Sequence, residues 1–213
     1  KTTPDVLSAL NRAGVKATFF VVATGNNDKY LPLISEAAAA GHQIALHSAS
    51  HEYSDIYQSS DAYWKDIDLL KERLSPYVRA DGLRYLRFLT APPRSGGRGL
   101  MQQLKEEVTA KGYAYVDWNV CAEDAVGGKP SAGTIFRNIV RETGEQTQCI
   151  VLMHDSATTG LPHHRRSPAR HHPVVQGQRF HLPYRRAGRP PAHNIAKSPG
   201  GPARRQTFRG FGA

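Results

Sequence analysis

The sequence predicts an α/β fold in which strands and helices alternate around a parallel sheet or barrel. Helix-like and strand-like segments follow one another along residues 1–160 of the 213-residue chain. The helical segments have the length of the connections that join parallel strands. No internal repeat interrupts this pattern. The chain is also long enough for one domain with a real hydrophobic core.

The first two elements have clear local signals. Thr3 and Pro4 supply a capping hydroxyl and a first-turn proline, which predicts a helix that runs to about Gly14. Residues 15–22 read VKATFFVV, a β-branched and aromatic run. Such a run is typical of a strand buried on both faces.

The remaining elements follow the same two patterns. Apolar residues at helical spacing, or compositions rich in Ala, Leu and Ile, predict helices at residues 31–40, 61–78, 100–111 and 134–142. Short apolar runs predict strands at residues 43–46, 83–88, 113–116 and 150–153. Active sites of parallel sheets and barrels collect at the carboxyl ends of the strands. The residues that follow these strands are therefore the candidates for chemistry.

Charge divides the chain into two parts. The whole chain carries a formal charge of +10, which alone indicates an anionic partner such as nucleic acid, a membrane surface or an acidic polymer. Residues 1–160 hold 17 basic and 18 acidic residues, whereas residues 161–213 hold 11 basic residues and no acidic one. The second part also contains six of the ten His and eight of the 14 Pro. We therefore expect a near-neutral domain over 1–160 and a disordered basic tail over 161–213.

Composition excludes several protein classes. No apolar run approaches the roughly 20 residues of a bilayer-spanning helix, so a membrane channel is excluded and no transmembrane segment is expected. Two cysteines are too few for a disulfide-dense miniprotein or a four-cysteine zinc ribbon. Cys121 and Cys149 lie near neighbouring strand ends, where they either pair or remain two buried thiols.

Histidines follow the strand predicted at 43–46. His47 and His51 are four residues apart, in the segment HSASH. If the chain turns into a helix there, both imidazoles lie on one face and can share a divalent ion. The alternative is a pair of ordinary surface or core histidines.

Two further strand ends carry reactive side chains. Asp117 and Trp118 follow residues 113–116, where a carboxylate can orient a histidine and an indole can wall a sugar pocket; a helix cap and a packing residue are the alternative. His154 directly follows the strand predicted at residues 150–153. It is a candidate general acid, or else a structural histidine. All of these residues are expected at one end of one sheet.

Four segments in this order resemble one family. KATFFVV, GHQIALHSASH, YAYVDWN and IVLMHDS are similar to segments of the polysaccharide deacetylases, the NodB-homology domains of carbohydrate esterase family four. The resemblance covers residues 1–160 and is strongest to bacterial peptidoglycan deacetylases. It implies a deformed parallel (β/α) barrel, here incomplete at both ends.

The resemblance implies a metal-dependent reaction. A divalent ion, with Zn²⁺ as the first candidate, would be held by an Asp and two His and would activate water to attack an N-acetyl carbonyl. His47 and His51 would be the imidazole ligands. His154 would be the general acid, and Asp117 the carboxylate that orients it. Trp118 would form part of the pocket wall, and Leu152 would line the acetyl-methyl pocket. Arg87 would pair with the catalytic base.

The chain departs from the family pattern at its beginning. The family motif T-F-D-D-G supplies the catalytic base and the third metal ligand, and it is expected just before Lys1. We therefore expect the third ligand, an Asp, to be absent from this chain. The prediction is that the 213 residues alone bind metal weakly and turn over little.

A second departure follows Arg87. Related sequences continue approximately as R-F-P-G-G-S-S, whereas this chain reads RFLTAPP. Codons can be chosen for residues 89–93 that read Pro-Asp-Gly-Ser-Ser in the neighbouring frame, and codons for residues 167–182 that encode an amphipathic helix followed by Gly and a strand. The hypothesis is that residues of about 89–98 and 160–188 are frame-shifted, with the frame recovered near Pro190.

The function implied by the resemblance is N-deacetylation of an amino-sugar polymer outside the cell or in its envelope. Peptidoglycan is the first substrate class and chitin-type oligomers the second. One alternative is a non-catalytic pseudoenzyme that binds carbohydrate. A third class, an anionic-polymer binder acting through the basic tail, ranks lower because the tail lacks the interleaved aromatic residues of a nucleic-acid groove, and no specific nucleic-acid partner is expected.

Overall fold

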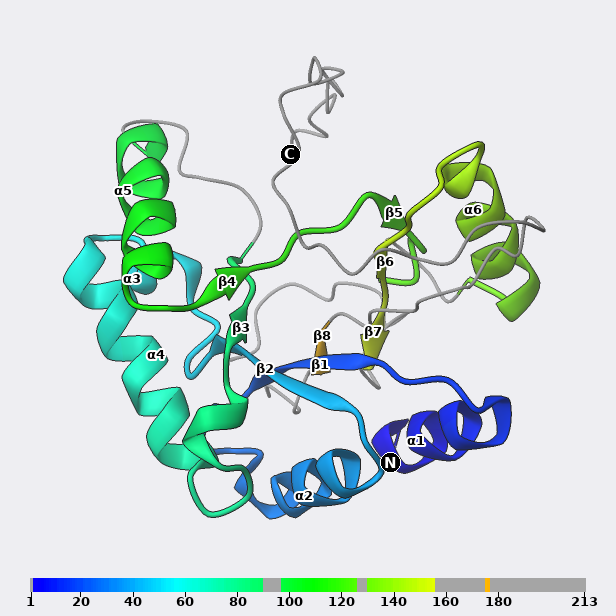
Figure 1. Cartoon of the computed structure of the whole chain (residues 1–213), viewed down its shortest axis with the longest axis horizontal. Coiled ribbons are helices and arrows are strands. Elements are labelled where there is room, and N and C mark those ends of the chain that lie inside the picture. Colours follow the sequence, from blue (N-terminus) through cyan, green and yellow to red (C-terminus); the bar gives the residue numbers. More distant parts are fainter. Residues whose placement is uncertain (1, 90–96, 126–129, 156–174, 177–213) are drawn as a thin grey trace, which may run out of the picture. The chain divides into compact units, whose positions relative to one another are not determined.

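Figure 1 shows the computed structural model of the chain, which describes residues 2–89, 97–125, 130–155 and 175–176. All of these residues belong to one compact unit, Lys1–Leu182. Most of the predicted tail at 161–213 and of the two proposed frame-shifted segments lies outside the described residues. Within that tail, Val175–Gln176 forms a strand, labelled β8.

The predicted helices are confirmed with small shifts of their ends. The five longer helices are α1 (Thr2–Ala13), α2 (Pro32–Ala39), α4 (Ser60–Leu74), α5 (Gly97–Ala110) and α6 (Ala132–Thr143). Ser59 caps α4 and Ser131 caps α6, because each hydroxyl accepts the backbone N–H three residues later. Three short elements were not predicted: η1 (Asp28–Tyr30), α3 (Tyr53–Ile56) and η2 (Ala80–Gly82).

The strands fall mostly where they were predicted. Five strands coincide in whole or in part with the predicted runs: β1 (Thr18–Val22), β2 (Gln43–Ser48), β3 (Tyr85–Leu86), β4 (Ala114–Tyr115) and β6 (Val151–Leu152). The second strand continues past its predicted end at residue 46 and therefore includes His47. Three strands were not predicted: β5 (Val120–Cys121), β7 (His154–Asp155) and β8, which lies in the tail that was expected to be disordered.

The strands form two sheets. The larger has the order β4-β3-β2-β1-β8-β7, and the smaller pairs β5 with β6. Strands β1 to β4 run parallel, as do β5 and β6, which confirms the predicted parallel arrangement for these strands. Strand β8 is antiparallel to both β1 and β7. The described strands therefore occupy two open sheets.

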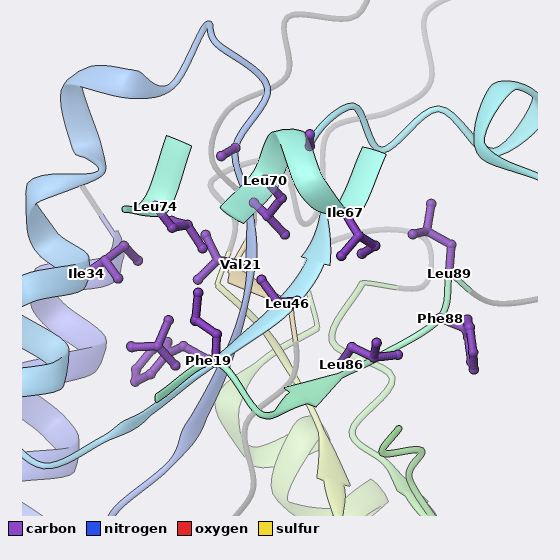
Figure 2. Packing of buried hydrophobic residues seen from close by; sticks show 14 of the residues in the cluster. Phe19, Val21, Ile34, Leu46, Ile67, Leu70, Leu74, Leu86, Phe88 and Leu89 are labelled. Atoms are coloured by element: carbon purple, nitrogen blue, oxygen red, sulfur yellow. The ribbon is translucent and has the colours of Figure 1, made fainter. Parts of the chain in front are cut away.

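The core lies between the sheet and α4. All five residues of β1 are buried, because this strand is covered on both faces. Helix α4 presents Ile67, Leu70 and Leu74 to the sheet at three- and four-residue spacing, and each is fully buried. Figure 2 shows these side chains above strand residues of β1 to β3. This packing fixes the carboxyl ends of β2 and β3.

Two features of the described residues bear on earlier alternatives. Cys121 and Cys149 are both free thiols, so the structure favours two partly buried thiols over a disulfide. Burial raises the pKa of the Cys121 thiol. Among the described helices, none combines the length and the apolar composition that a bilayer crossing requires.

Candidate active site

His47 lies at the carboxyl end of β2 with one ring nitrogen fixed. Its side chain is buried, with 2% of the residue exposed. Nδ1 lies 2.8 Å from the backbone carbonyl oxygen of Arg87 on the neighbouring chain segment. Because a carbonyl can only accept, the proton must sit on Nδ1, and Nε2 carries the lone pair. Metal-binding histidines are usually held by a hydrogen bond of this kind from the second nitrogen.

His51 reaches the same place from a loop. Residues 49–52 are not helical, so the prediction that both histidines lie on one face of a helix is wrong. The two imidazoles nevertheless meet, with ring centroids 5.5 Å apart and planes at 61°. His51 has a φ of 60°, in the left-handed region. Such a conformation costs a non-glycine residue about 1 to 3 kcal/mol, so the surrounding loop must hold it.

Arg87 follows β3 and is a deeply buried cation. Its guanidinium stacks over the ring of Phe20 at 4.2 Å and lies 5.4 Å from the ring of Trp118. Nε donates to the carbonyl of Val116, whereas both Nη atoms are buried without a hydrogen-bond partner among the described residues. Burial lowers the pKa of this guanidinium to about 10, and the nearby Asp117 carboxylate opposes that shift.

His154 on β7 is held by a carboxylate that the sequence reading missed. Its Nδ1 lies 2.9 Å from Oδ1 of Asp124, and its backbone N–H donates to Oδ2 of the same residue at 2.6 Å. Asp124 is buried. The carboxylate therefore fixes both the ring and the backbone of His154, the arrangement that orients an acid–base histidine.

The carboxylate that contacts His154 is thus Asp124 and not Asp117, the residue predicted for this role. Asp117 is exposed and follows β4, whereas Asp124 follows β5. The register of β5 and β6 pairs Val120 with Val151 and Cys121 with Leu152, which carries the chain after β5 alongside His154. The sequence signal that could have identified Asp124 is the short strand β5 followed by an acidic residue. A strand of two residues is too short to be recognised from an alternating hydrophobic pattern.

The two remaining candidates are Trp118 and Leu152. Trp118 is half-buried and contacts Arg87 through its ring face. Leu152 is buried on β6, two residues before His154. The structure thus brings together His47, His51, Arg87 and Trp118. It places His154 on β7 in contact with Asp124, and β1 and β8 lie between β7 and β2 in the sheet.

The donor set for a metal ion consists of imidazoles. Within the described ranges, no group of three or more His, Cys, Asp and Glu side chains is arranged to hold a metal ion. His47 and His51 are suited to supply two ligands, because the first has its tautomer fixed and the second ring lies beside it. Catalytic zinc sites normally have three protein ligands. The imidazole pair therefore fits part of such a site.

Comparisons with known proteins converge on one family. A sequence model of the polysaccharide deacetylases matches residues 1–95. The peptidoglycan-N-acetylglucosamine deacetylase of Bacillus cereus is 28% identical over 160 residues, which cover 73% of this chain and 55% of that protein. The chain therefore spans about half the length of this curated relative.

Solved structures share the fold. The catalytic domain of peptidoglycan N-acetylglucosamine deacetylase from Eubacterium rectale aligns with a TM-score of 0.67 and 32% identity, over 75% of this chain and 73% of that one. A family 4 acetyl xylan esterase from Clostridium thermocellum, solved with a cobalt ion, aligns with a TM-score of 0.54 and 24% identity over 71% of this chain and 69% of its own. These likenesses confirm the predicted (β/α)-barrel class. The chain belongs to the polysaccharide deacetylase family, carbohydrate esterase family 4.

Proposed function

We propose that this chain is the catalytic portion of a metal-dependent hydrolase that removes N-acetyl groups from an amino-sugar polymer. Peptidoglycan is the proposed substrate, because two of the three relatives compared above are named for it, and chitin-type oligomers come second. A peptidoglycan substrate places the protein at the cell envelope. The observation that carries the proposal is the pair of imidazoles at the end of β2, with the proton of His47 fixed on Nδ1 by the Arg87 carbonyl.

Each residue has a distinct proposed task. A divalent ion, with Zn²⁺ as the first candidate, would polarise the acetyl carbonyl and lower the pKa of a water molecule. His47 and His51 would hold it through their imidazole nitrogens. His154 would donate a proton to the leaving amine, while Asp124 stabilises the charged ring and keeps its orientation. Leu152 is the proposed wall of the acetyl-methyl pocket.

Arg87 supports the proposal through its unpaired donors. A buried guanidinium is stabilised when a carboxylate pairs with it, and neither Nη atom has a hydrogen-bond partner among the described residues. The carboxylate of a catalytic base is the proposed partner. Trp118 covers another part of the same cation, so one side of the proposed pocket is aromatic.

We also propose that the 213 residues by themselves bind metal weakly and turn over slowly. The support is the donor set, in which the described residues offer two imidazoles where three ligands are usual. A specific observation also favours a carbohydrate-binding pseudoenzyme as the second candidate. His154 lies on β7, and two strands, β1 and β8, lie between β7 and the strand β2 that carries His47.

Acetate release from N-acetylated peptidoglycan and from chitin oligomers tests both proposals. The assay compares the 213-residue chain with the product of the same gene read upstream of Lys1, each with and without a chelator. The proposal expects chelator-sensitive release from the longer product and little from the shorter one. Release that is unaffected by the chelator contradicts metal dependence. Sugar binding by a longer product that releases no acetate favours the pseudoenzyme.

A further inference from the structure

A buried carboxylate on α4 binds the loop that carries His51. Asp66 is 9% exposed and lies in the middle of the helix. Its Oδ2 accepts the Ser48 hydroxyl at 2.7 Å and the Ala49 N–H at 2.9 Å, and its Oδ1 accepts the Ser50 N–H at 2.9 Å. One side chain thus binds three consecutive residues of the HSASH loop.

The same carboxylate reaches His51 through one hydroxyl. The Ser48 hydroxyl donates a hydrogen bond to Asp66. Its oxygen is therefore oriented to accept a hydrogen bond from the backbone N–H of His51 at 2.8 Å. His51 is the loop residue in the left-handed conformation, with a φ of 60°. The hydrogen bond from its N–H therefore fixes the backbone at the point where the chain is least favoured.

Packing covers this loop only in part, because Ala49 is fully buried whereas Ser50 is half-buried. A cavity of about 250 Å³ opens beside it, with a lining that includes Ala49 and Ser50 from the loop and Arg73 from α4. Arg73 donates to the Ala49 carbonyl at 3.4 Å, at the long limit for a hydrogen bond. Three shorter bonds go directly to Asp66, and the His51 N–H bonds to the Ser48 hydroxyl, which itself donates to Asp66.

The helix itself has no evident need for this residue. Its first turn is capped by Ser59, and Asp66 lies in its interior, where a short acidic side chain is a poor helix former. We infer that Asp66 is a positioning residue that fixes the 48–51 loop and thereby holds the imidazole of His51 against that of His47. The role of His51 as a metal ligand rests on the proposed function.

Asp66→Asn tests the inference, with Asp68→Asn as its control. The side-chain amide of Asp66→Asn keeps one acceptor oxygen and replaces the other with an NH2 group. That NH2 group would face loop groups that are themselves hydrogen-bond donors. Asp68 lies two residues further along the helix and is exposed, where it pairs only with Lys71 among the described ion pairs. Amide hydrogen exchange, followed by NMR in the 213-residue chain without metal, should accelerate at least tenfold at Ala49, Ser50 and His51 in Asp66→Asn. Amides of β1 and all amides of Asp68→Asn should be unchanged.

A second readout measures the ligand site. Outer-shell substitutions typically lower metal affinity about 10- to 100-fold, and we expect that loss for Co²⁺ binding by Asp66→Asn, followed by its visible absorption. Ser48→Ala removes the link to His51 but keeps two backbone bonds to Asp66, so it should give a smaller loss. This variant decides the question if Asp66→Asn does not fold.

The two readouts separate the inference from the function on which it rests. Loop amides in Asp66→Asn and Ser48→Ala that exchange at the wild-type rate overturn the positioning role. A wild-type chain that shows no Co²⁺ absorption counts against the proposed metal site, while the exchange measurement still decides the role of Asp66.

Discussion

The two groups of candidate residues differ in how their surroundings hold them. His47 lies at the carboxyl end of β2 and His51 follows it; β2 is a six-residue strand that pairs with two parallel neighbours and lies beneath α4. His154 lies on β7, a two-residue strand whose described partner β8 is also two residues long. The strand that carries His47 is fixed by a buried core, the loop that carries His51 is held by hydrogen bonds to Asp66, and His154 is held by one carboxylate, Asp124. A long, well-covered strand therefore places its own residues through packing, whereas loops and short strands depend on individual hydrogen bonds.

The largest expected effect is on the core that supports β2. Leu70→Ala empties a fully buried position on α4, which should lower the free energy of unfolding by about 2 to 5 kcal/mol. Urea denaturation measures it. The matched control is Leu69→Ala on the same helix, where the side chain is exposed and the loss should stay below about 1 kcal/mol. Equal losses would mean that α4 does not cover the sheet.

The next prediction tests the partner of His154. In the product read upstream of Lys1, Asp124→Asn should lower kcat about 100-fold or more, because the carboxylate that orients the ring is lost. Asp117→Asn in the same product should cost less than about tenfold, since that carboxylate is exposed. Steady-state acetate release provides both values. A larger loss for Asp117→Asn would restore the sequence-based assignment.

A smaller effect is expected at the buried cation. Arg87→Met removes a buried guanidinium whose two Nη atoms have no hydrogen-bond partner among the described residues. The free energy of unfolding at neutral pH should therefore be unchanged or raised by about 1 to 2 kcal/mol. The folded-state pKa of Arg87 is lowered to about 10, so its burial penalty applies below that pH and is relieved as the pH rises through it. The advantage of Arg87→Met should therefore shrink above about pH 10. Denaturation at pH 7 and at higher pH follows it, and an advantage that grows with pH contradicts the account.

The smallest effect is expected on α6. Phe136 is 67% exposed, so Phe136→Ser should change the free energy of unfolding by less than about 0.5 kcal/mol. Thermal unfolding of the two proteins is the measurement. A clear loss would show that a further part of the chain covers this side chain.

The same contrast explains what the sequence could predict. Residues 15–22 and 61–78 have strong periodic patterns, and both the elements and their burial are as predicted. The meeting of His47 with His51 was predicted, but through a helix, because the hydrogen bonds of Asp66 that form the loop are not visible in a spacing of four. The parallel order failed at β8, since its antiparallel pairing depends on contacts distant in sequence.

Asp124 shows the limit most clearly. Nothing local distinguishes it from Asp117, and only the register of β5 on β6 brings it to His154. Arg87 was predicted as a partner of the catalytic base by resemblance alone. Its burial over Phe20 results from the pairing of β2 with both β1 and β3, which no single segment encodes.

A metal titration tests the central claim most directly. Co²⁺ is added to the wild-type chain, to His47→Ala and to His51→Ala, and the absorption of the bound ion is followed. The account predicts one weakly bound ion per wild-type chain and an affinity at least tenfold lower in each variant, because each loses one of two imidazole ligands. Binding of equal strength in all three proteins would contradict the assignment of this loop as the metal site.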